Sequence, residues 1–489
     1  MKKLIFASVM ALAFTGLVYT PTLRAQDDQI TIKDPAEFNS YQMATTQADP
    51  KAKAVALEGF LQTYPQSVVK KDVLVLLVRT YQGLGDLDKI LSAANRLLQV
   101  DPSNLPAIYI SVYIKKGQCA KTSDAQTCDD TAALAQRGLP LTTKPAKTPD
   151  DEWKSLTSAA FPLFHSTIAL DDVLSKKDFK AAIAEYRTEL MLYPADQTTN
   201  GPGLVDTLQL GEAYSKQEAV DAKALKVDAA AAAAATDPDA KAKATADAKA
   251  AKDADDADQT QAIWFYSRAW SFAPANFKGQ IEPKIEYWYN KYHGTADGPD
   301  AIKKQIDAIK AQSTGSLFPP ASYTVTPAPT PDQIAHSVIV STPDLTKLNL
   351  GDKEFILANG TPEDANKLWA LLKDQLTPVP GVVIEATSTV IKLAVTDDAK
   401  ALKIPDFIVT LKTALTEKDV PAAGYVYGLA GKGEAELDAT YDSFKQVPAT
   451  DTVAQTAQIY LKDASIQAKK ATAPAHKPAA GHHTAPAAH

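Results

Sequence analysis

The feature that most constrains the fold is a helix-turn-helix pattern that recurs along the first two-thirds of the chain. In VLVLLVRTYQGLGDLDKILSAANRLLQVDPSN, an apolar helix is followed by Gly85-Asp86, an amphipathic helix and Asp101-Pro102. Further segments of this kind end at Tyr64-Pro65 and at Pro194. Because one such helix pair cannot bury its apolar face alone, several pairs in series predict an array in which each pair covers the next.

This pattern resembles the tetratricopeptide repeat (TPR) family, with an aromatic residue late in the first helix, a small turn and a proline after the second helix. The residues that carry the resemblance are Tyr64, Pro65, Tyr81, Gly85, Pro102, Ala182, Tyr186, Pro194, Gly211, Tyr214, Ala262, Tyr266, Ala269 and Pro274. The resemblance implies a mostly α-helical solenoid over residues 34–315. Ile90 and Leu97 depart from it, because the family has small residues at helix contacts there. A non-repeating helical bundle is the alternative.

An alanine-rich run, DAAAAAAATDPDAKAKATADAKAAKDADDAD, lies inside one of these repeats. Gly211 and Tyr214 precede it in the first helix of the repeat, and Ala262 and Tyr266 follow it in the second, so it is an insertion at about 220–258. Alanine and lysine favour helix, and Asp237-Pro238 supplies an N-cap and a first-turn proline. We expect one helix to about Ala235, a turn, and a second helix from Pro238. The alternative is a disordered segment.

The first 25 residues have the pattern of a secretory signal peptide. Lys2 and Lys3 precede an apolar run from Leu4 to Tyr19, and Ala25 is a small residue at the expected cut. The run is short for a bilayer-spanning helix, which is the alternative interpretation. We therefore expect export to the periplasm or outside the cell, with no membrane span after cleavage.

Cys119 and Cys128 are the only cysteines of the chain. In an exported protein such a pair usually forms a disulfide. A metal site would need further ligands nearby, and the segment GQCAKTSDAQTCDD offers none, so a structural disulfide is expected.

The helical pattern ends near residue 315. Residues 316–335 are rich in proline and predict an extended linker. Residues 336–468 predict a small domain with one helix, which begins at Thr361-Pro362. Alternating β-branched runs follow, and they predict an antiparallel β-rich barrel or sandwich.

The strand order and glycine placement over 380–468 resemble the OB-fold. OB-folds bind nucleic acids or oligosaccharides, and the resemblance makes Tyr425, Tyr427, Tyr441 and Phe444 candidates for a binding face. Packing in the core is the alternative role for these rings. Residues 469–489 are a low-complexity Ala/Pro/His tail that we expect to be disordered. The histidines of this tail could bind a metal weakly, but a solvated tail without bound metal is the favoured interpretation.

Charge and motifs argue against two classes of function. The formal net charge of -7 argues against a dedicated nucleic-acid binder, because phosphate contacts need a basic face. The histidines outside the tail, His165, His293 and His336, are scattered. The chain has no HExxH, Gly-x-Ser-x-Gly, Walker or Rossmann motif. The sequence therefore predicts neither catalysis nor a cofactor.

The predicted function is that of an exported, non-enzymatic scaffold that binds proteins through a TPR-like solenoid. Solenoids present a concave surface to extended peptides or partner helices. Tyr287, Trp288 and Tyr292 form a possible groove, with packing against the last repeat as the alternative. Two other functions remain open: binding of cell-wall carbohydrate or peptidoglycan through the β domain, and hydrolysis at an unrecognised site.

Overall fold

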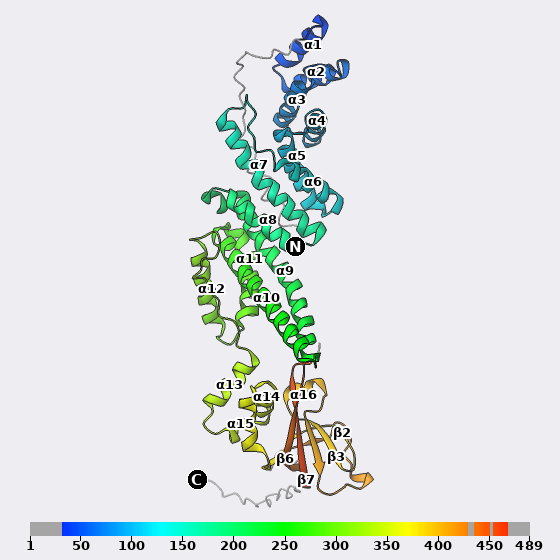
Figure 1. Ribbon diagram of the computed structural model, residues 1–489, viewed down its shortest axis with the longest axis vertical. Coiled ribbons are helices and arrows are strands. Elements are labelled where there is room, and N and C mark those ends of the chain that lie inside the picture. The colour runs from blue at the N-terminus through cyan, green and yellow to red at the C-terminus, as the bar shows by residue number, and fades with distance from the viewer. Residues whose placement is uncertain (1–31, 429–434, 450–452, 468–489) are drawn as a thin grey trace, which may run out of the picture. The chain divides into compact units, whose positions relative to one another are not determined.

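The computed structural model describes residues 32–428, 435–449 and 453–467 (Figure 1). The predicted signal peptide and the predicted Ala/Pro/His tail lie outside these ranges. The chain forms two compact units, which meet in the sequence between Pro327 and Ala328. The first unit is helical, and the second combines helices with a curled sheet. This confirms the predicted fold class, a mostly helical region followed by a small β domain.

Unit 1 is built from helices that pack in chain order. They are α1 (Pro35–Thr46), α2 (Pro50–Thr63), α3 (Lys70–Leu84), α4 (Leu87–Val100), α5 (Leu105–Thr122), α6 (Ala125–Gly138), α7 (Asp150–Asp171), α8 (Phe179–Leu192), α9 (Gly201–Ala234), α10 (Pro238–Phe272), α11 (Ala275–His293) and α12 (Pro299–Ser313). A π-helical turn, η1 (Asp172–Lys176), follows α7, and a 3₁₀ turn, η2 (Ala195–Thr198), follows α8. Each helix contacts the next one along the chain, as Figure 1 shows. This is the packing expected of stacked helix pairs.

Three apolar clusters form the core of unit 1. The first joins α1 to α5, the second joins α5 to α7, and the third joins α7 to α12. Leu74, Phe164 and Trp264 are fully buried members of the three. Burying a side chain such as leucine or phenylalanine contributes roughly 1.5–3 kcal/mol, so the core stabilises the array along its whole length.

Local sequence signals fix the ends of these helices. Asp86 caps α4 by accepting a hydrogen bond from the Lys89 N–H at 3.1 Å, and Asp178 caps α8 in the same way through the Ala181 N–H at 3.0 Å. Gly85 ends α3 with a φ of 70°, a left-handed conformation that glycine adopts without steric cost. The Gly85-Asp86 pair thus ends one helix and starts the next.

The alanine-rich insertion is a helical hairpin. Helix α9 ends at Ala234 and α10 begins at Pro238, where the Asp237 side chain accepts a hydrogen bond from the Ala240 N–H at 2.9 Å. These bounds confirm the predicted hairpin and its turn. We call residues 222–254 the arm, because no residue in that range is buried.

The arm is held together by small side chains. Half-buried alanines recur at helical spacing, with Ala222 and Ala232 on α9 and Ala244, Ala248 and Ala251 on α10. Methyl groups bury little apolar area. Exposed Lys–Asp pairs four residues apart add support along α10, for example Lys249 with Asp253 at 2.6 Å, but such pairs contribute only about 0.2–0.5 kcal/mol each.

The proline-rich segment differs from the predicted linker 316–335, because its first half packs on unit 1. The rings of Phe318 and Phe265 lie 6.0 Å apart, and those of Tyr323 and Trp264 lie 4.9 Å apart. The Tyr323 hydroxyl donates a hydrogen bond to the Thr260 carbonyl at 2.8 Å. The last residues of the segment begin a helix of unit 2, so the segment is divided between the two units.

Unit 2 contains more helices than predicted. They are α13 (Pro331–Ser341), α14 (Leu350–Asn359), α15 (Pro362–Leu372) and α16 (Asp397–Leu402), with 3₁₀ turns η3 (Leu345–Lys347) and η4 (Glu417–Asp419). The predicted helix is α15, and its N-cap is Thr361, whose hydroxyl accepts a hydrogen bond from the Asp364 N–H at 3.2 Å. The prediction of a single helix was wrong, because it missed α13, α14 and α16.

The sheet of unit 2 is mixed and curled. Its strands are β1 (Leu376–Pro378), β2 (Gly381–Ala386), β3 (Val390–Ala394), β4 (Phe407–Leu411), β5 (Val426–Tyr427), β6 (Glu436–Val447) and β7 (Thr456–Gln467), in the order β1-β6-β7-β4-β3-β2-β5. The pair β4–β7 is parallel, so the prediction of an antiparallel sheet was wrong at this pair.

The chain bends between β1 and β2, and this bend curls the sheet. β1 pairs with β6 while β2 pairs with β3, and only Val379 and Pro380 separate the two strands. The ladders therefore join β6, the bent β1–β2 segment, β3, β4 and β7 into a circuit. The result is a curled half-barrel within the seven-stranded sheet, which agrees with the prediction of a small β domain.

No helix among the described residues has the length and the apolar character needed to cross a membrane.

Candidate functional site

The repeat-signature residues lie mainly in the interior of unit 1. Ala182, Tyr186, Ala262, Tyr266 and Ala269 are almost fully buried, as are Tyr81 and Tyr214. A Cβ atom on Gly211 would come 3.2 Å from the Tyr266 ring, so a small residue is needed there. Tyr64, Pro65, Pro102, Pro194 and Pro274 stand at helix ends. All of these residues therefore act in packing and in turns.

The three aromatic residues of the possible groove do not share one surface. Trp288 is buried in the core, whereas Tyr287 is exposed and meets Trp288 edge-on. Tyr292 lines a separate cavity of about 340 Å³ with Gln261 and Tyr323. The structure thus divides the predicted groove into a core residue, a surface residue and a cavity residue.

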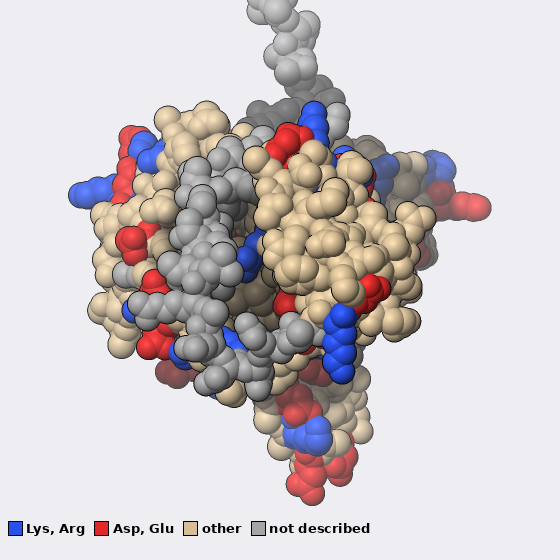
Figure 2. Space-filling view, turned by 90° about the horizontal axis from the view of Figure 1, so that it is seen from above, with Lys and Arg blue, Asp and Glu red and all other residues tan. Residues whose placement is uncertain are grey.

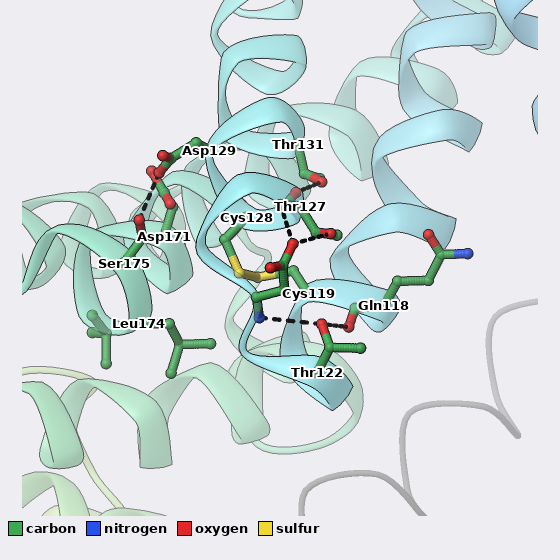
Figure 3. The surroundings of a disulfide bond; sticks show 12 residues. Gln118, Cys119, Thr122, Thr127, Cys128, Asp129, Thr131, Asp171, Leu174 and Ser175 are labelled. Atoms are coloured by element: carbon green, nitrogen blue, oxygen red, sulfur yellow. Dashed lines mark hydrogen bonds between the residues drawn. A yellow bond between two sulfur atoms is a disulfide. The ribbon is translucent and has the colours of Figure 1, made fainter.

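Cys119 and Cys128 form the predicted disulfide (Figure 3). It joins α5 to α6, and both cysteines are buried. The neighbouring Asp129 accepts a hydrogen bond from the Ser175 hydroxyl at 2.7 Å, which ties α6 to η1. The disulfide is part of the helix packing and has no ligand-binding geometry of its own.

Four helices of unit 1, α5, α7, α8 with its C-cap, and α9, contribute to a group that we call the inner polar cluster. Its members are the buried Ser166, Glu189 and Asp206 and the half-buried Lys116 and Tyr193. The Lys116 ammonium donates a hydrogen bond to the Ser166 hydroxyl at 2.5 Å and lies 3.9 Å from the Asp206 carboxylate. These contacts join α5, α7 and α9, the first helices of three successive pairs, so they mark one side of the array.

Glu189 is the most unusual member of the inner polar cluster. Its side chain has no solvent exposure, and burial, followed by the charge of Asp206, raises its pKa well above the usual range. A carboxyl group in this environment stays protonated at neutral pH. No local pattern predicts this site, because Glu189 and Lys116 are 73 positions apart in the chain.

A second group lies where the arm leaves the repeats. We call Glu218 and Asp221 of α9 with Asp255 and Asp258 of α10 the arm carboxylate cluster. All four are buried. The Asp255 carboxyl lies beside that of Glu218, and the Asp258 carboxyl lies beside that of Asp221. Two neighbouring buried carboxylates repel each other, so each pair favours a state in which one carboxyl is protonated.

Burial is the main cause of proton retention in the arm carboxylate cluster. It raises the pKa of Asp255 to about 6 with the help of Glu218, and that of Asp258 to about 8 with the help of Asp221. Two lysines oppose this effect. Lys291 of α11 pairs with Glu218, and Lys180 of α8 lies 3.9 Å from Asp221. The cluster is thus a place where ionisation and helix packing are linked.

The isolated histidines do not build a catalytic or metal site together. His165 lies 2.6 Å from Glu185, and His336 lies 3.1 Å from Asp364, in different units. His293 contacts Asp297 at 3.0 Å. Within the ranges that the structure describes, no group of three or more His, Cys, Asp or Glu side chains is arranged to hold a metal ion.

The aromatic candidates of unit 2 lie mostly in its core. Tyr427 and Tyr441 are buried, and Phe444 packs against Trp369 with ring centroids 4.9 Å apart. Only Tyr425 of the four is substantially exposed. The core-packing alternative therefore applies to three of the four rings.

Charges of both signs are mixed on the molecular surface seen in Figure 2. Lysine and arginine side chains lie beside aspartate and glutamate side chains, as the ion pairs along α10 also show. A mixed surface agrees with the net charge of -7 and gives no support for a nucleic-acid interface.

No protein-family model and no curated protein matches the chain. The TPR resemblance therefore stays a prediction from the residues named above.

Proposed function

We propose that the protein is an exported, non-enzymatic scaffold of the bacterial cell envelope whose helical unit binds other proteins. The proposal rests on one observation, the packing of α1 to α12 in chain order. Stacked helix pairs expose an extended surface that suits peptides and partner helices. The step from this fold to binding is an analogy at the level of the fold.

Two features support export. The chain starts with basic residues, an apolar run and a small residue at Ala25, the pattern of a signal peptide. The Cys119–Cys128 disulfide fits an oxidising compartment such as the periplasm.

The first helix of each pair is the proposed contact surface. The inner polar cluster lies on the side where α5, α7 and α9 converge, and Tyr113 of α5 is half-buried. On α11, Tyr287 is 58% exposed. Tyrosines in such positions offer rigid apolar area with a polar tip, a combination common at protein interfaces.

Photo-crosslinking in cells tests the proposal on the full chain. A photoreactive phenylalanine replaces Tyr113 or Tyr287 on first helices, and Val55 of α2, which is 73% exposed, serves as the control position on a second helix. We expect discrete crosslinked proteins from Tyr113 and Tyr287 and none from Val55. Equal products at all three positions, or no protein product at the two tyrosines, would contradict the proposal. Crosslinks to peptidoglycan fragments would favour the carbohydrate-binding alternative.

A further inference from the structure

Arg268 of α10 is a buried cation without an acidic partner. Its side chain is only 4% exposed. In the part of the chain that the structure describes, no Asp or Glu oxygen forms an ion pair with its guanidinium. The partners are neutral: Nη1 donates to the Ser313 carbonyl at 2.7 Å and the Ser316 carbonyl at 2.8 Å, and Nη2 donates to the Thr198 hydroxyl at 3.2 Å.

This environment is costly for an arginine. A guanidinium keeps its charge in proteins, and arginine is almost never fully buried unless it is paired. Carbonyl dipoles and the Phe272 ring, 5.0 Å from Cζ, offset part of the cost of burial. The three hydrogen bonds use two N–H donors of Nη1 and one of Nη2, and the buried Nε has no partner. A guanidinium has five N–H donors, so the side chain retains the capacity to bind an anion.

Arg268 lines a cavity whose other lining residues are both polar and apolar. The cavity has a volume of about 370 Å³ and lies among the end of α8, η2, α10 and the residues after α12. Its lining includes Arg268 and the polar Thr199 and Thr314, and it also includes the apolar Leu190, Met191 and Leu317. This size is at the lower end of the range for small-molecule pockets. A lining that combines a buried cation with apolar side chains matches a ligand with one anionic end and a short apolar body.

We propose that this cavity binds a small carboxylic acid, with its carboxylate on Arg268 and its apolar part against Leu190, Met191 and Leu317. Carboxylates match the planar fork of a guanidinium, and such charge-assisted hydrogen bonds are about twice as strong as neutral ones. The site lies on second helices, α8 and α10, and is independent of the proposed protein-binding surface. The ligand is either a free short-chain acid or the carboxyl end of a peptide, since both carry the same chemistry.

Binding to the full-length purified protein tests the site, with calorimetry at neutral pH as the measurement. The probes are 4-methylpentanoate for a free acid and N-acetyl-leucine for a peptide end, each beside its uncharged amide, together with inorganic phosphate. We expect saturable binding of at least one carboxylate and a loss of about ten-fold or more in affinity for its amide. The carboxylate with the higher affinity shows whether the ligand is a free acid or the carboxyl end of a peptide. Equal binding of acid and amide, or binding of phosphate alone, would overturn the proposal.

Two exposed neighbours provide matched variants that keep Arg268 and its hydrogen bonds. Met191, which is 64% exposed, lines the cavity, whereas Leu192, which is 44% exposed, does not. Met191→Glu places a negative charge at the rim and should weaken carboxylate binding about three-fold or more, while Leu192→Glu should leave it unchanged. Arg268→Lys keeps the charge but removes the fork, and we expect it to weaken binding further. Unchanged affinity in Met191→Glu, or an equal loss in both glutamate variants, would count against the site.

Discussion

The Asp258 carboxyl of α10 lies beside the Asp221 carboxyl of α9, and both are buried where the arm leaves the repeats. Burial, with the help of Asp221, raises the pKa of Asp258 to about 8 from its usual value of 3.8. The folded protein therefore keeps a proton that the unfolded chain releases near pH 4. Between about pH 4 and pH 8 the folded state binds more protons, so the contribution of Asp258 to stability falls as the pH rises through that window.

Asp258→Asn should remove this pH dependence. Asparagine cannot ionise, and its amide can donate a hydrogen bond to Asp221. We expect the variant to be more stable than the natural protein at about pH 8.5 and to differ little from it near pH 4. Urea unfolding followed by circular dichroism at both pH values measures the difference. Asp256→Asn is the control, at a half-buried position two residues earlier where the carboxylate pairs with Lys252, and it should show no such gain in stability at high pH; the same shift in both variants would refute the assignment.

Gly138→Ala should destabilise unit 1. A Cβ atom on Gly138 would lie 2.3 Å from the Phe164 ring, and that ring is fully buried between α6 and α7. Because the ring has to move within a packed core, we expect a loss of about 1–3 kcal/mol in the free energy of unfolding. Gly117→Ala on α5 meets no atom within 4 Å and should stabilise its helix by roughly 0.5–1 kcal/mol. We therefore expect the free energy of unfolding to fall in Gly138→Ala and to rise in Gly117→Ala. A stabilising Gly138→Ala would contradict this packing.

Removing the disulfide should cost stability without removing the fold. The Cys119–Cys128 bond closes a short loop, with a sequence separation of 9, and a loop of that length predicts a loss of about 2–3 kcal/mol in a Cys→Ala double variant. Chemical denaturation of the variant and of the oxidised protein measures this difference in the free energy of unfolding. Both cysteines are buried, so thiol labelling after mild reduction should need denaturant. Rapid reduction of the folded protein would show that the bond is exposed.

Shortening the arm should leave the repeats folded. Deleting Leu225–Ala235 and Asp239–Lys249 removes ten residues and the C-cap from α9 and eleven residues from α10, about three turns each, and keeps the turn at Asp237-Pro238. The arm buries no residue, so we expect less helical ellipticity but nearly the same free energy of unfolding. Loss of a cooperative unfolding transition would show that the arm is needed for the fold.

The parts that the sequence predicted well depend on local signals. Asp237-Pro238 marks a helix start whatever surrounds it, and the alanine run favours helix, so both helices of the arm could be placed. Cys119 and Cys128 are the only cysteines, so only one pairing was possible.

The parts that were missed depend on contacts between distant residues. Helix α13 contains Ile334, Val338, Ile339 and Val340, and β-branched residues favour a strand over a short helix. Its signals were confined to the first turn: the capping box of Thr330 and Gln333, and Pro331 and Asp332. The parallel β4–β7 pair joins Phe407 to Ile459, residues that no local pattern connects.

The two buried charged sites were also invisible in the sequence. Asp255 and Asp258 belong to a run that looks like a solvated surface, and only the return of α10 onto α9 buries them. Arg268 is a single arginine whose burial depends on residues 313–316, more than forty positions away. In a helix, the spacing of these three residues places them near the face of the buried Ala262 and Phe265. That spacing was the one available hint that they are buried.

The arm extends from the arm carboxylate cluster, so a change of helix angle at its base would produce a larger displacement at its tip. From Asp221 to Ala234, α9 extends about 20 Å at 1.5 Å per residue, so a tilt of about 10° at the base would move the tip by roughly 3–4 Å. Asp258 lies at this base, so a change in helix angle that accompanied its ionisation would cause its largest displacement at the turn around Thr236.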